Sequence, residues 1–148
     1  MSYSLKADIL KEISEEDLIG LTDDEGDGIV NDDRVTAAIA RADAIIDSYC
    51  GQVEAVPFVT VPAVIKQHSI TIAIYFLYSR RSIAPEVRKD NYKDALKHLQ
   101  DIATGKAALP PVTDDEVNAE PQTSRTEDDK TISMGKKSDG SSGSLDNY

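Results

Sequence analysis

The sequence predicts an all-α protein: a compact bundle of four to five helices with a long extended C-terminal tail. In several segments, apolar residues recur at intervals of three and four, which is helical spacing. Only 5% of the 148 residues are aromatic and none is Trp, which suits packed aliphatic helices better than a β-sandwich. Large apolar residues are dense from Leu5 to Ile102 and sparse from Pro110 onward. We therefore expect a helical domain at 1–105 and an arm at 106–148.

Two short helices are expected first. Ser4 can cap a helix that runs through Ile13. Ser14 and Asp17 stand in the relation of a capping box and predict a second helix, which ends near Gly20 or Leu21. A polar loop follows at 22–33.

A longer helix follows, capped by Asp32 or Asp33. Gly51 is its expected C-terminal stop. One face is apolar at helical spacing and comprises Val35, Ala38, Ile39, Ala42, Ile45, Ile46 and Tyr49. An extended link at 52–61 comes next, with Phe58 as its anchor.

Two prolines introduce the last two helices. Pro62 suits the first turn of a helix to about Arg80, since no hydrogen-bonded N–H is needed there. The centre of this helix is apolar on nearly every face, which predicts that it is the central helix of the domain. The β-branched residues there would also allow a strand, but the helical spacing of the apolar residues favours a helix. Pro85 starts an amphipathic helix that ends at Gly105. Its inward residues are predicted to be Val87, Tyr92, Ala95, Leu96, Leu99 and Ile102.

The arm at 106–148 is rich in Pro, Asp, Glu, Gly and Ser and has no usable period. By itself it cannot bury enough apolar surface to offset its chain entropy, so we expect disorder unless it docks on a partner. The residues predicted to dock on a neighbouring protein are its few apolar ones: Val112, Val117, Ile132, Met134, Leu145 and Tyr148.

The net charge of −11 argues against wrapping of DNA or sequence-specific binding of nucleic acid, which need clustered Lys and Arg. The single cysteine, Cys50, can form no intrachain disulfide and fits a reducing cytoplasm. The most apolar stretch, Ser69 to Tyr78, is too short to span a bilayer, so no membrane association is expected.

An acidic loop is the strongest local motif. It matches part of a calcium-binding loop, in which oxygen ligands stand at positions one, three, five and nine. Arg34 occupies position twelve, where a bidentate Glu is needed, so any affinity for calcium is weakened. The alternative is an acidic turn that Gly26 and Gly28 allow through positive φ. The candidate metal ligands are Asp23, Glu25, Asp27 and Asn31.

No arrangement typical of an enzyme is present. Cys50, His68 and His98 have no partner at a spacing typical of catalysis or metal binding, and packing roles are expected for them. The chain lacks GxSxG, P-loop and dinucleotide motifs. We therefore predict no catalytic residue, no enzymatic activity and no cofactor other than a weakly bound calcium ion.

Basic residues gather around one helix–helix turn of this acidic chain. They are Arg80, Arg81, Arg88, Lys89, Lys93 and Lys97. They form either a solvated face or a subunit interface. In the second case Arg80, Arg81, Arg88 and Lys89 would meet Asp24 and Asp27 of an adjacent subunit and close a ring. A place beside a DNA channel is disfavoured by the surrounding negative charge.

Three segments in fixed order carry a resemblance. They are LTDDEGDGIVNDDRVTAAIARADAIIDSY, PFVTVPAVIKQHSITIAIYFLYSRR and PEVRKDNYKDALKHLQDIATGKAAL. Together they resemble the small head-to-tail connector family of Mu-like phages and prophages, similar to the head-completion adaptor proteins of long-tailed phages. The resemblance covers residues 3–109. The run CGQVEAVPF and the tail after Leu109 depart from the usual family pattern.

The resemblance implies a structural virion protein made in the bacterial host cytoplasm. It implies a homo-oligomeric ring, expected to be dodecameric, at the neck of the particle. Such a ring joins the portal protein to a tail or tail-terminator protein and extends the DNA channel. The alternative function is a calcium-dependent binding module built on the loop at 23–34.

Overall fold

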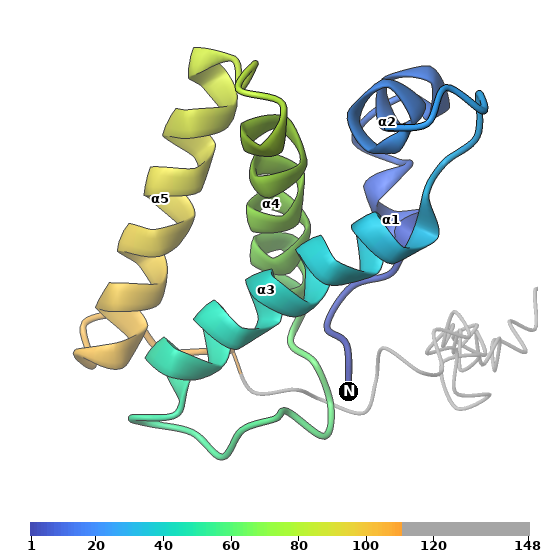
Figure 1. Ribbon diagram of the computed structural model, residues 1–148. Coiled ribbons are helices and arrows are strands. Elements are labelled where there is room, and N and C mark those ends of the chain that lie inside the picture. The colour runs from blue at the N-terminus through green and yellow to red at the C-terminus, as the bar shows by residue number, and fades with distance from the viewer. Residues whose placement is uncertain (111–148) are drawn as a thin grey trace, which may run out of the picture. The chain divides into compact units, whose positions relative to one another are not determined.

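Five α-helices in the order α1 to α5 make up the fold, and no strand occurs in residues 1–110 (Figure 1). The computed structural model describes these residues; the six predicted docking residues of the arm lie outside them. The helices are α1 (Lys6–Ile9), α2 (Glu15–Thr22), α3 (Asp32–Cys50), α4 (Ala63–Arg80) and α5 (Glu86–Ala103). The predicted all-α class is therefore confirmed.

Side chains and prolines set the beginnings of the helices. The Ser14 hydroxyl accepts a hydrogen bond from the backbone N–H of Asp17 at 3.1 Å and caps α2 as predicted. Pro62 and Pro85 directly precede α4 and α5. The predicted cap of α3, Asp32 or Asp33, is wrong: Asn31 takes that position, because its side chain accepts a hydrogen bond from the N–H of Arg34 at 3.2 Å.

The ends of the helices follow equally local causes. Gly51 closes α3 as expected. After α5, Gly105 adopts a φ of +73°. Glycine adopts this conformation at little energetic cost because it has no Cβ. The first helix is shorter than predicted. It ends at Ile9, and residues up to Ile13 continue as turns.

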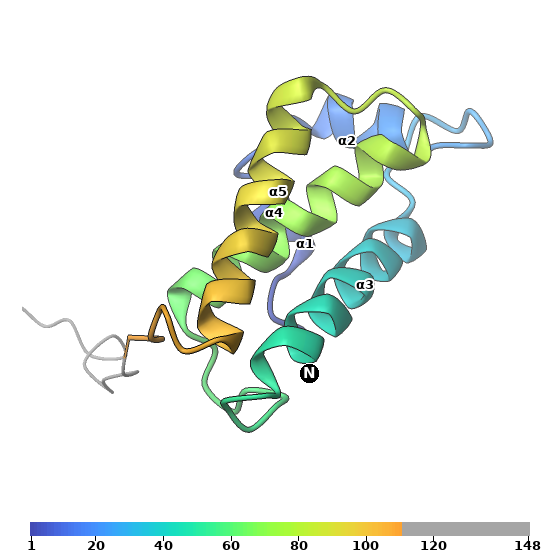
Figure 2. The same ribbon diagram turned by 90° about the vertical axis from the view of Figure 1, so that its left-hand side faces the viewer.

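Helix α4 is the centre of the bundle, as its apolar sequence predicts. It packs against all four other helices, and α5 and α2 lie on opposite sides of it (Figures 1 and 2). Its residues Ile65, Ile72 and Ile74 are buried almost completely. No helix in residues 1–110 is long and apolar enough to cross a membrane.

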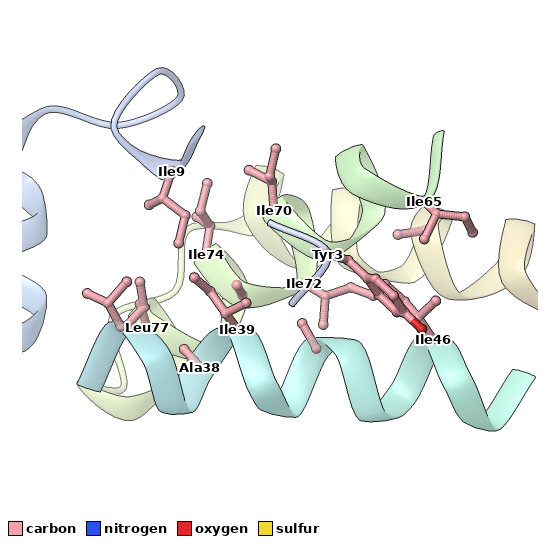
Figure 3. Close-up of a cluster of buried hydrophobic side chains, with 14 of the residues drawn as sticks. Tyr3, Ile9, Ala38, Ile39, Ile46, Ile65, Ile70, Ile72, Ile74 and Leu77 are labelled. Atoms are coloured by element: carbon pink, nitrogen blue, oxygen red, sulfur yellow. The ribbon is translucent and has the colours of Figure 1, made fainter. Parts of the chain in front are cut away.

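The core fills the space between α3 and α4 (Figure 3). Ile39 and Ile46 of α3 face Ile72 of α4, and Tyr3 inserts beside them from the N-terminal segment. Phe58 in the α3–α4 link is 8% exposed and packs against Tyr3, with ring centroids 5.6 Å apart. The link is therefore anchored by this residue, as predicted.

The inward position predicted for Val87 is wrong, because this side chain is 68% exposed. The buried stripe of α5 contains Ala95, Leu99 and Ile102, with Tyr92 partly buried. Val87 precedes Tyr92 by five positions, which is about 140° around a helix of 3.6 residues per turn. It therefore lies off the stripe.

Candidate functional site

The acidic loop between α2 and α3 is closed by the first of its carboxylates. Asp23 accepts hydrogen bonds from the backbone N–H groups of Gly26, Asp27 and Gly28 at 2.7, 3.1 and 2.9 Å. These bonds, that of Gly28 foremost, hold the pKa of Asp23 below its usual value. Gly26 and Gly28 have φ values of 83° and 71°, as a tight acidic turn requires.

Asp24, next in the loop, is surrounded by three arginines of its own chain. Arg80 makes a two-pronged ion pair with it, at 2.6 and 3.0 Å. Arg81 and Arg34 approach to 3.3 and 3.5 Å. The hydrogen bond from Arg80 and the nearby positive charges hold the pKa of Asp24 below its usual value. The loop is thereby tied to the last turn of α4.

The residues predicted for a subunit interface are thus partly engaged within one chain. The Arg80–Asp24 and Arg81–Asp24 contacts, expected between subunits, occur here between α4 and its own loop. Arg88 lies over the ring of Tyr78 at 5.9 Å, and Lys89 pairs with Glu86 at 3.1 Å. The side chain of Asp27 is exposed. The subunit contact itself remains a prediction.

The candidate metal ligands do not converge. Asn31 uses its side-chain oxygen to cap α3, and Asp23 closes the loop. In the described part of the chain, no three His, Cys, Asp or Glu side chains are arranged to hold a metal ion. A calcium ion in this loop would also meet the positive charges of Arg34 and Arg80 around Asp24. Calcium binding remains an untested prediction that this charge arrangement disfavours.

A pocket of about 570 Å³ opens between α3, α4 and α5, and sequence reasoning missed it. It combines positive charge with aromatic surface. Tyr75 and Tyr92 stack across α4 and α5, with ring centroids 4.1 Å apart. The Arg41 guanidinium lies 4.1 Å from the centre of the Phe76 ring, within range of a cation–π interaction. Its charged and aromatic lining is Arg34, Arg41, Arg80, Tyr75, Phe76 and Tyr92.

A buried polar network joins the N-terminal segment to α3 and α4, and it too was not predicted. The carboxylate of Asp43 accepts hydrogen bonds from the hydroxyls of Ser69 and Ser2 at 2.6 and 3.0 Å, and from the backbone N–H of Tyr3 at 3.1 Å. The Tyr3 hydroxyl bonds to Asp47, and burial foremost raises the pKa of Tyr3 to about 12. This network positions the segment that inserts into the core.

His68 of α4 and His98 of α5 form a hydrogen-bonded pair, with Nε2 and Nδ1 2.8 Å apart. Burial foremost, together with the second imidazole, lowers the pKa of His68 to about 4. The packing role expected for both histidines fits this contact. Burial also raises the pKa of the Cys50 thiol to about 11, which fits a packing role.

The histidine pair predicts a pH-dependent stability. Well above pH 6.5 the imidazole of His68 is neutral in both the folded and the unfolded protein. Between pH 6.5 and 4 mainly the unfolded chain takes up the proton. The free energy of unfolding therefore falls as the pH falls. From pH 7 to 4.5, wild type should lose about 2 kcal/mol relative to the His68→Gln variant. Urea denaturation of both proteins at the two pH values measures this difference. Parallel changes in both proteins would contradict the prediction.

The fold and these sites define a small acidic, all-helical protein. The family described as Bacteriophage Mu, Gp36 matches residues 3–128, so the chain belongs to that family of Mu-like phage proteins. The chain is also 37% identical over 83 residues to the Mu-like prophage FluMu protein gp36 of Haemophilus influenzae (strain Rd). That match covers 56% of this chain and 57% of the relative, a little more than half of each.

Proposed function

We propose that the protein is a head-to-tail connector: a structural virion protein that forms a ring at the neck of a Mu-like phage. In this proposal the ring is dodecameric, joins the portal protein to a tail or tail-terminator protein, and extends the DNA channel. The observation that carries the proposal is membership of the phage Mu Gp36 family over residues 3–128. The resemblance to the small connectors also implies a compact helical bundle, which is the fold observed.

The charge of the chain supports this role physically. A wall that lines a DNA channel must let the duplex pass, and clustered Lys and Arg would hold its phosphates. The chain carries a net charge of −11, and Asp24 pairs with three of its arginines. An acidic ring therefore conducts DNA with little adhesion.

The arm extends the proposal to the partners of the ring. Its apolar residues, from Val112 to Tyr148, are proposed to dock on a neighbouring virion protein when the particle assembles. Such a segment loses its conformational freedom on binding, and the contacts it makes offset that cost.

The test is addition of the full chain to tailless, DNA-filled heads of the same phage, followed by cryo-electron microscopy of the vertex. A symmetric ring below the portal is expected. A bare portal after addition contradicts the connector function. Heads incubated with an unrelated acidic protein of similar size provide the control for nonspecific density.

The alternative function is a calcium-dependent binding module. A measurement on the same purified chain distinguishes this module from a connector. Thermal melting of the chain with micromolar calcium and with chelator is expected to give equal midpoints for a connector. A rise of several degrees with calcium would favour the module, because a ligand that binds only the folded state stabilises it.

A further inference from the structure

The pocket between α3, α4 and α5 carries an excess of positive charge. Arg34 and Arg80 share the single carboxylate of Asp24, at 3.5 and 2.6 Å. Arg41 makes no ion pair with any of residues 1–110, and its guanidinium rests on Phe76 at the pocket wall. Three guanidinium groups thus face one carboxylate. The pocket has the capacity to bind a further carboxylate.

The first turn of α2 carries carboxylates that form no ion pair with residues 1–110. Glu15 and Glu16 are exposed and take part in none of the ion pairs within residues 1–110. The Asp17 carboxylate beside them accepts one local hydrogen bond, from the Ser14 hydroxyl. This acidic turn does not line the pocket, and α2 lies across α4 from α5 (Figures 1 and 2). Both surfaces of one chain can therefore be engaged at once.

We propose that the arginine pocket of one copy receives the acidic first turn of α2 from a second copy. The two surfaces are different patches, so the contact is heterologous and each copy can bind a neighbour on either side. Such contacts propagate and close into a ring when the rotation between copies allows it. The inference rests on the proposed connector function for its setting, and it names the contact between neighbouring subunits.

A second copy fits the pocket better than a nucleic acid does. A phosphate backbone would bring a row of negative charges beside Asp24, which pairs with Arg34 and Arg80 of the pocket lining. Two glutamates at the start of a helix present only a small cluster of charge. Between chains of net charge −11, an acid-to-arginine contact also replaces repulsion with attraction at the point of closest approach.

The experiment uses charge reversal in the full chain, with sedimentation velocity at low salt over a range of concentrations. Wild type is expected to self-associate. Arg41→Glu and Glu16→Arg, each alone, should weaken association at least tenfold, because each brings like charges together. An equal mixture of the two variants should restore association: copies alternate, and every contact again joins opposite charges. The restored association also shows that both variants are folded.

Glu54→Arg and Lys97→Glu are the matched controls, since both side chains are exposed and neither lines the pocket. Both controls should associate as wild type does. A monomeric wild type at every concentration, or a mixture as weak as the single variants, overturns the inference. Tight binding of a single-stranded oligonucleotide that Arg41→Glu abolishes also overturns it, in favour of a nucleic acid. If a ring forms at the portal from Arg41→Glu protein alone, the connector function stands and this contact is wrong.

Discussion

Replacing Ile72 with alanine is expected to lower the free energy of unfolding by about 3 kcal/mol. Ile72 has no exposed surface and lies at the centre of α4, where side chains of α3 pack against it (Figure 3). The substitution removes buried methyl and methylene groups and leaves a cavity that the surrounding helices fill only in part. The free energy of unfolding of native proteins is about 5–15 kcal/mol, so the expected loss is a large fraction of the total stability. Urea denaturation followed by circular dichroism measures it.

Two further substitutions calibrate that result. Ile72→Val removes one methyl group and should cost about 1 kcal/mol. Val59→Ala changes a side chain that is 90% exposed and should cost less than about 0.5 kcal/mol. If Ile72→Ala costs no more than Val59→Ala, the packing of α4 at the centre of the bundle is wrong.

Replacing Asp43 with alanine is expected to destabilise the fold by about 3 kcal/mol. Three donors lose the carboxylate at once: the hydroxyls of Ser69 and Ser2 and the N–H of Tyr3. Of these, the Ser2 hydroxyl keeps the backbone carbonyl of Ser4 as an acceptor. Ser69 is fully buried and Tyr3 is 3% exposed, so water cannot replace the carboxylate without rearrangement. Hydrogen exchange at the Tyr3 amide should also become faster, because the N-terminal segment is released.

The control for Asp43 lies on the same helix. Asp33 is exposed in the first turn of α3, and Asp33→Ala should cost less than about 1 kcal/mol through the helix dipole. Equal losses for Asp33→Ala and Asp43→Ala would show that the buried network contributes nothing of its own. Unchanged exchange at Tyr3 in Asp43→Ala would contradict the anchoring role.

Local signals in the sequence were sufficient to predict most of the helices. Ser14 with Asp17, Gly51, Pro62 and Pro85 each mark a helix boundary through short-range chemistry that needs no tertiary context. The predicted cap of α3 is wrong because three residues that can cap a helix, Asn31 to Asp33, follow one another. The inward position predicted for Val87 is wrong because this residue is apolar but its angle around α5 places it off the buried stripe.

The sites depended on contacts between helices, and spacing along one helix does not contain them. A usable signal did exist for the histidine pair. His68 and His98 both lie fifteen residues from Ile83, the middle of the turn between two antiparallel helices, so the hairpin brings them together. Tyr75 and Tyr92 obey the same symmetry within one residue. For Asp24 and Arg80, the opposite charges predict a contact, but charge alone does not distinguish a contact within one chain from a contact between neighbouring chains.

Asp24 has a mechanical consequence for the molecule. Its carboxylate bridges the loop after α2 and the last turn of α4, while Leu18 and Leu21 of α2 are buried in the core. Helix α2 is thus attached to the bundle in two ways, by the burial of these leucines and by the Asp24–Arg80 ion pair just beyond its C-terminal end. Displacing α2 from α4 therefore requires both the loss of apolar burial and the breaking of the Asp24–Arg80 ion pair.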